Sequence, residues 1–246
     1  MKTLFLIVKE DLINLIKNPM WIFYATLFPI LLVVTLGFLT NESYSSVVSS
    51  FDYYGITLII YSALMSGLTS SNAFLEEKIK KPNMRIIYAP CRDSYIYISK
   101  IVATFIFEFI FHLIDMAILV LIFNIHLDSI FHLIIILALV ELFSVTLGIM
   151  MCCIFKTEMT ANQILSIVIN LLAILGGLVF SLDGYGKVVR AISLCSPFKY
   201  ITKSIFQIIY DNDFSLFLPV ILILVIGTMI MLGICKLTFK KEDYIC

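Results

Sequence analysis

The sequence predicts an all-α polytopic membrane protein, a single transmembrane domain over residues 1–246 with six membrane-spanning helices. Two observations support this fold class. Hydrophobic residues make up 61% of the chain and charged residues 14%, with a mean hydropathy of +1.05, whereas soluble domains are typically about 45–50% apolar and about 25% charged. The apolar residues are also grouped in blocks of about 20, the length at which a helix crosses a hydrocarbon layer of roughly 30 Å.

Residues 2–18 are predicted to form an amphipathic helix on the membrane surface rather than a span. Apolar side chains repeat on one side at helical spacing, and polar residues such as Lys9 and Lys17 lie elsewhere. Proline disfavours helix in the residue before it, so we expect Asn18-Pro19 to end this helix. The apolar stripe consists of Leu4, Phe5, Val8, Leu12, Leu15 and Ile16.

Six apolar segments follow as candidate spans, separated by polar stretches. Trp21 and Tyr24 are expected near one membrane interface, where amphipathic aromatic rings are favoured. Pro29 is expected to kink the first span, because it has no backbone N–H to donate. The predicted spans are 21–39, 53–71, 101–123, 130–155, 163–180 and 217–237.

The distribution of Lys and Arg predicts the orientation, because cytoplasmic loops carry an excess of these residues. Three lie in the N-terminal segment, six in residues 76–100, one in the turn 156–162 and three in the C-terminal tail. Residues 40–52 and 124–129 contain none. The alternation predicts a multi-pass protein of the cell membrane with both termini in the cytoplasm.

Residues 181–216 do not follow this charge pattern. They are predicted to lie outside, and they still carry four basic residues. Two apolar helical pieces, about 188–194 and 198–210, flank Cys195-Ser196-Pro197, and neither is long enough to cross. Two short re-entrant helices are compatible with the sequence, since backbone at membrane depth is tolerated where protein buries it. An amphipathic external loop is the alternative. The basic residues are Lys187, Arg190, Lys199 and Lys203.

In this order, the segments resemble the ABC-2 type permeases, the membrane subunits of ATP-driven exporters. The shared features are a surface helix that ends in Lys17-Asn18-Pro19, six spans, a charged loop after the second span, and Ser196-Pro197 between two short helices. In the family, the charged loop contains a Gly-Thr pair, which Lys81-Pro82 replace here. The loop otherwise keeps the order of the family residues with Glu76, Glu77, Lys78, Arg85, Pro90 and Lys100.

The resemblance implies that the loop couples the spans to an ATPase. Residues of about 83–98 would form a helix seated in a groove of that ATPase, with Arg85 and Arg92 near acidic groups and Ile86 in an apolar hollow. A solvated run of charges is the alternative. The partners implied are two ABC ATPase subunits, a second permease copy, identical or related, and membrane lipid. The path between the permeases would carry an amphipathic or lipid-like cargo, such as a peptide, a drug or a lipid-linked molecule, out of the cell.

The chain itself is expected to be a transport subunit and not an enzyme, with no cofactor of its own. ATP and Mg²⁺ would be bound by the partner ATPase. A P-loop requires GxxxxGK[ST], whose backbone amides surround phosphate. The nearest approach, Gly186-Lys187, has Ser181 in place of the first glycine and Val188 in place of the hydroxyl residue.

Four ionisable residues are predicted inside the membrane. Glu108, His112 and Asp115 are spaced i, i+4 and i+7 on one face of the third span, and Glu141 lies near the middle of the fourth. At 1.5 Å rise per residue, His112 and Glu141 come to similar depth. Such groups normally face a bundle interior or a watery path. They could therefore line the cargo route or form the contact between two copies of the chain. Alternatively, they could form hydrogen bonds that hold the third and fourth spans together, or bind a metal ion.

Two other functions remain open from the sequence. A proton-coupled secondary transporter would use Glu108, His112, Asp115 and Glu141 as a relay, although the interrupted helices in two corresponding halves that are typical of many such transporters are not evident. A membrane immunity or assembly protein would bind a toxic peptide without transporting it. Nucleic acid is not indicated as a partner, because 17 basic and 17 acidic residues leave no net charge.

Overall fold

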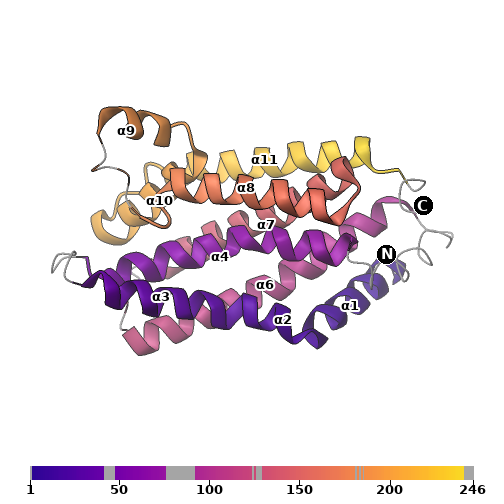
Figure 1. Cartoon of the computed structure of the whole chain (residues 1–246), viewed down its shortest axis with the longest axis horizontal. Helices are drawn as coiled ribbons and strands as arrows, with labels where there is room; N and C mark the ends of the chain where they lie inside the picture. Colours follow the sequence, from indigo (N-terminus) through magenta and orange to yellow (C-terminus); the bar gives the residue numbers. More distant parts are fainter. Residues whose placement is uncertain are drawn as a thin grey trace.

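The computed structural model describes residues 2–41, 48–75, 92–123, 125, 129–180, 182, 184 and 186–240. Every regular element in these ranges is a helix. The long helices run along one axis as an elongated bundle, and the start of α1 (Lys2–Lys17) lies at the same end of the bundle as the end of α11 (Phe217–Thr238) (Figure 1). The predicted all-α fold class is confirmed.

Six helices within the described ranges are long and apolar enough to cross a membrane. Their positions agree with the six predicted spans, and α4 and α6 extend beyond the predicted apolar blocks toward the α1 end of the bundle. The spans are α2–η1–α3 (Pro19–Leu39), α4 (Ser50–Leu75), α6 (Ser94–Phe123), α7 (Ile130–Phe155), α8 (Glu158–Gly176) and α11 (Phe217–Thr238).

The first span begins after Asn18, as the sequence predicts, and its helix widens just before Pro29. Asn18 separates α1 from α2 (Pro19–Ile22), and its side-chain oxygen accepts a hydrogen bond of 3.1 Å from the backbone N–H of Met20. Next comes a π-helical turn, η1 (Phe23–Leu27), and then α3 (Phe28–Leu39). The N–H of Phe28 donates to the carbonyl of Phe23. The wider turn forms because Pro29 has no N–H for the carbonyl four residues before it.

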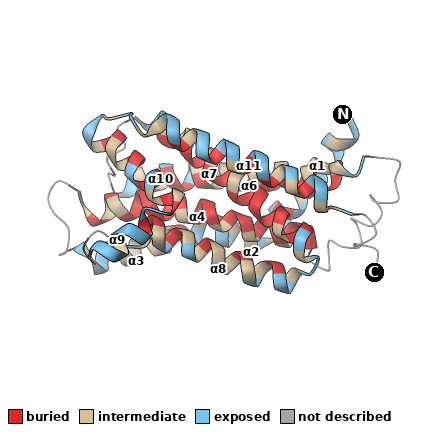
Figure 2. Cartoon of the chain, turned by 90° about the horizontal axis from the view of Figure 1, so that it is seen from above, coloured by how far each residue is buried: buried red, intermediate tan, exposed pale blue. Residues whose placement is uncertain are grey.

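The central helix of the bundle is α4, which packs against α3, α6, α7 and α8. Of the residues in its most apolar stretch, 78% are buried, and Figure 2 shows this concentration of buried residues on α4. Its closest neighbour is α7, because a Cβ placed on Gly148 would overlap the carbonyl oxygen of Gly67. The hydroxyl of Ser70 donates to the carbonyl of Val145 at 2.9 Å. Small residues thus bring two backbones together, as is common between membrane helices.

The segment with the anomalous charges contains α9 (Lys187–Ser193), α10 (Pro197–Phe206) and a π-helical turn, η3 (Gln207–Asp211). Both helices are too short to cross a membrane. The buried residues of α10 include Phe198 and Ile201, and the helix packs against α8 and α11. The depth of this pair of helices in the membrane stays a prediction, as does the position of α1 on the membrane surface.

Candidate functional site

A cavity of about 370 Å³ lies between α4 and the first span. Aromatic rings of Trp21, Tyr24 and Phe28 form one wall, and α4 forms the other. The remaining lining residues are Tyr61, Ser62, Met65, Ser66, Leu68, Thr69, Asn72 and Glu108. The cavity therefore combines an apolar, aromatic wall with several hydroxyl and amide groups.

The wall on α4 is a narrow stripe of partly exposed residues. Between Tyr54 and Leu75, all positions of α4 are buried except the four that form this stripe. The stripe is held beside α8 by two amide contacts: the hydroxyl of Tyr61 donates to Oδ1 of Asn170 at 3.1 Å, and Nδ2 of Asn162 donates to Oδ1 of Asn72 at 2.6 Å. The open side of α4 thus lies between the first span and α8. The stripe consists of Tyr61, Met65, Leu68 and Asn72.

Glu108 is the one acidic or basic residue among those that line the cavity. It belongs to α6, is 3% exposed, and has a hydrogen bond with the side chain of Thr69 on α4. The hydrogen bond between α6 and α4 therefore holds the carboxyl group of Glu108 at the cavity. A carboxyl group in an aromatic cavity can interact with a cationic group of a bound molecule.

His112 links three helices in the interior of the bundle. Its Nε2 lies 2.8 Å from the hydroxyl of Ser62 on α4, and its Nδ1 lies 3.5 Å from Oε1 of Glu141 on α7. His112 and Glu141 are both fully buried, at the similar depth that the sequence predicts. This geometry favours an interhelical contact for the two residues over a surface where two copies of the chain would meet.

Asp115, the last of the four predicted intramembrane residues, is fully buried on α6. Neither of its carboxyl oxygens has a hydrogen-bond partner among the described residues. It does not line the cavity. Within the described part of the chain, no group of three or more His, Cys, Asp or Glu side chains is placed to hold a metal ion. Of the four predicted residues, Glu108 is thus the one that the structure places at the cavity.

A buried ion pair joins α1 to α6. The ammonium group of Lys100 contacts the carboxylate of Asp11, and the two residues are 2% and 7% exposed. Asp11 is not among the residues predicted from the sequence, although its position carries a signal. Leu4, Val8, Asp11 and Leu15 are spaced 4, 3 and 4 residues apart, so the carboxylate lies within the apolar stripe of the amphipathic helix.

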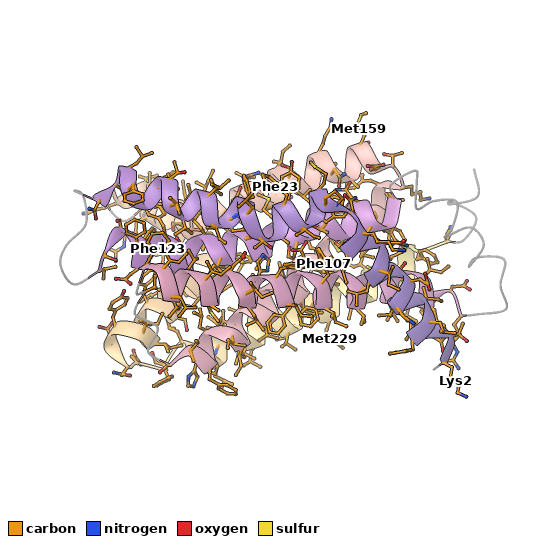
Figure 3. The ribbon with its side chains drawn as sticks, turned by 90° about the horizontal axis from the view of Figure 1, so that it is seen from below. Lys2, Phe23, Phe107, Phe123, Met159 and Met229 are labelled. Carbon is orange, nitrogen blue, oxygen red and sulfur yellow. The ribbon has the colours of Figure 1, made fainter. Side chains whose placement is uncertain are left out.

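The rest of α1 presents two kinds of exposed side chain. Lys9 and Lys17 are exposed, and Figure 3 shows Lys2 at the free end of the helix, pointing away from the bundle. Phe5 and Ile16 of the predicted apolar stripe are also exposed, at 70% and 50%. Exposed apolar and basic groups together are compatible with contact to lipid and anionic head groups.

Most of the predicted ATPase-coupling residues, Glu76, Glu77, Arg85, Ile86 and Pro90, lie outside the described residues. Of the others, Arg92 is exposed just before α6, and Lys100 is engaged by Asp11. The described residues that flank the segment, at the end of α4 and the start of α6, lie at the α1 end of the bundle (Figure 1).

Ser196 and Pro197 begin α10. The hydroxyl of Ser196 accepts a hydrogen bond of 3.3 Å from the N–H of Phe198, and Pro197 occupies the first turn. Three further hydroxyls bind the last carbonyls of α8, which have no partner within that helix. These bonds join Ser193 to Leu175 at 2.7 Å, Thr202 to Gly176 at 2.9 Å and Tyr53 to Gly177 at 2.6 Å.

Comparison with known proteins agrees with this architecture. The family model described as the ABC-2 type transporter matches residues 2–210, from the start of α1 into η3. No curated protein matches the chain. The ABC-2 membrane domain is the membrane-spanning permease component of an ABC transporter and does not contain the ATPase site. With six candidate spans and a match over most of its length, the chain belongs to the ABC-2 type transporter family.

Proposed function

We propose that the chain is the permease half of an ABC exporter of the cell membrane, with both termini in the cytoplasm. Two such permeases, identical or related, form the path, and two ATPase subunits that bind ATP and Mg²⁺ dock at the α1 end of the bundle. The cargo is an amphipathic or lipid-like molecule. The observation that carries this proposal is the cavity of about 370 Å³ on the open side of α4.

The lining of the cavity supports an amphipathic cargo. Binding sites for small molecules usually have volumes of about 300–1,000 Å³ and apolar walls with a few polar groups. Rings of Trp21, Tyr24 and Phe28 supply apolar surface, and Thr69 and Glu108 supply polar groups. A second permease placed over the open stripe of α4 would close the cavity between the two copies.

The position of α6 supports coupling to an ATPase. This helix starts at the end of the bundle where the charged loop joins it, and Lys100 ties that start to α1 through Asp11. Glu108 lies on the same helix, about 12 Å further along its axis. A displacement at the start of α6 would therefore move α1 and the wall of the cavity together.

The test is a cavity-filling substitution in the complex of the permease with its ATPase, reconstituted in lipid nanodiscs. Met65→Trp places a large ring in the cavity, and Met229→Trp is the matched control because Met229 points outward from α11 and is 65% exposed (Figure 3). We expect Met65→Trp to abolish stimulation of the ATPase by amphipathic cargo, and Met229→Trp to retain it. Equal stimulation in both variants would show that the cavity is not the cargo site.

A further inference from the structure

A second and larger cavity, of about 600 Å³, lies at the end of the bundle opposite α1. It is lined by residues of α9, α10 and η3 and by residues at the beginning of α4 and the end of α8. Figure 1 shows that these elements lie at that end of the bundle. Three of the four basic residues that do not fit the charge pattern of the sequence line this cavity, whereas Lys187 does not. These three are Arg190, Lys199 and Lys203.

The charge inside the cavity is predominantly positive. Asp211 is the one acidic residue among those that line it, against three basic ones. Lys199 and Lys203 lie four residues apart on α10, so the two positive charges are on the same face of the helix. Arg190 and Lys203 form no ion pair within the part of the chain that the structure describes. An anionic ligand would complement the positive charge of Arg190 and Lys203.

Aromatic rings form the inner wall beside these charges. The rings of Tyr53 and Phe206 stack with centroids 5.5 Å apart, and those of Phe206 and Tyr210 stack at 6.0 Å. The hydroxyl of Tyr210 and the side-chain oxygen of Gln207 are buried without a hydrogen-bond partner among the described residues. Burial raises the pKa of Tyr210 to about 12, with a further contribution from Asp52. At neutral pH, Tyr210 is thus a hydrogen-bond donor that a ligand can use.

Exposed apolar side chains lie in the same segment of the chain. Val188 and Ile192 on α9 are 73% and 52% exposed, and Leu194, which lines the cavity, is 45% exposed. Such side chains suit contact with acyl chains at a membrane interface. A ligand that meets the cations, the donor and Leu194 has an anionic head group and a hydrophobic tail.

We propose that this cavity binds the phosphate head group of an anionic membrane lipid. Arg190 and Lys203 contact the phosphate oxygens, since guanidinium and ammonium groups form the stronger, charge-assisted hydrogen bonds to phosphate. With the proposed orientation of the chain, this lipid belongs to the outer leaflet. The binding site itself does not depend on that orientation. Lipid bound there contacts the short helices that connect α8 to α11. This lipid site is therefore distinct from the proposed cargo site in the cavity on α4.

Binding is tested on the full chain alone, in detergent, with fluorescent phosphatidylglycerol as the probe. We expect Arg190→Gln and Lys203→Gln each to weaken binding about tenfold, since a charge-assisted hydrogen bond contributes about 1.5 kcal/mol or more. Lys187→Gln is the matched control, with the same charge change in the same segment outside the cavity, and we expect it to bind as the unsubstituted chain does. Equal weakening by Lys187→Gln and Lys203→Gln would overturn the site, because it would indicate attraction to the surface charge in general.

Two competitors identify the ligand. Phosphatidylcholine, which has a phosphate but no net charge, is expected to displace the probe poorly, and unlabelled phosphatidylglycerol is expected to displace it fully. Displacement by inorganic phosphate at concentrations as low as those of the lipid would overturn the lipid assignment in favour of a soluble anion. Since neither ATPase nor cargo is present, failure of this test leaves the proposed transport function unaffected. Failure of the cargo test with Met65→Trp likewise leaves the lipid site unaffected.

Discussion

The carboxylate of Asp11 and the ammonium group of Lys100 form an ion pair that is almost closed to solvent, with exposed fractions of 7% and 2%. The pair joins α1 to the first part of α6, against which α1 packs. Removing both charges is often tolerated where the replacements pack well, but removing one partner leaves a buried charge without compensation. The pair therefore fixes how α1 sits on the bundle.

Asp11→Asn and Lys100→Met are each expected to destabilise the protein by about 3–5 kcal/mol, because each leaves one buried charge. The paired substitution Asp11→Leu with Lys100→Met is expected to recover most of that loss. Glu10→Gln, at an exposed neighbouring position, is the control. Thermal unfolding in detergent, followed by circular dichroism, measures all four. Single variants as stable as Glu10→Gln would contradict the prediction.

Glu108→Gln is expected to weaken the response of the ATPase to cationic amphipathic molecules about tenfold, with little change for neutral ones. The reason is that Glu108 is the one acidic residue lining the cavity on α4. A cationic group bound there favours the carboxylate form, and a charge-assisted hydrogen bond contributes about 1.5 kcal/mol or more. The measurement is ATPase activity of the reconstituted complex against cargo concentration. Asp115→Asn, on the same helix outside the cavity, is the control. An equal loss for neutral and cationic molecules would argue against charge recognition.

His112→Ala is expected to destabilise the bundle by about 1–3 kcal/mol, because it leaves the hydroxyl of Ser62 without its hydrogen-bond partner and leaves a cavity beside the buried carboxyl of Glu141. His112→Gln, which can still hydrogen-bond to Ser62, should lose less stability, as thermal unfolding in detergent would measure.

Transport is also expected to continue when an ionophore collapses the proton gradient while ATP is present. Loss of transport under that condition would favour a proton relay through His112.

Gly148→Ala is expected to destabilise the protein by about 1–3 kcal/mol, since the added Cβ would overlap the backbone of Gly67 on α4 and force α4 and α7 apart. Gly233→Ala in α11 is the matched control. No atom lies within 4 Å of a Cβ built at Gly233, and alanine favours a helix interior over glycine by about 1 kcal/mol. Thermal unfolding should rank Gly148→Ala below the unsubstituted chain and Gly233→Ala at or above it. The reverse ranking would show that α4 and α7 are not in close contact.

The spans could be predicted because they are continuous apolar blocks, which a high mean hydropathy identifies directly. Hydropathy could not predict how far α4 and α6 extend at the α1 end of the bundle. There, Asn72 pairs with Asn162, and Lys100 pairs with Asp11. Polar groups that satisfy each other inside the protein allow a helix to continue past the end of its apolar block.

The candidate site was only partly predictable. Helical spacing placed Glu108, His112 and Asp115 on one face of α6, but the packing of α4 decides that Glu108 alone reaches the cavity. The stripe formed by Tyr61, Met65, Leu68 and Asn72 mixes apolar and polar residues, so it has no signature in the sequence. Its exposure follows from which helices surround α4, and that is a property of the tertiary structure.

The three hydroxyls that bind the last carbonyls of α8 couple Tyr53 at the start of α4 and the helices α9 and α10 to that end of α8. These bonds hold the elements together at that end of the bundle, and bending there would break hydrogen bonds that are buried or partly buried. The π-helical turn before Pro29 has a longer hydrogen-bonding ring and one carbonyl without its usual partner. Bending of the first span is therefore expected at that turn, between α2 and α3.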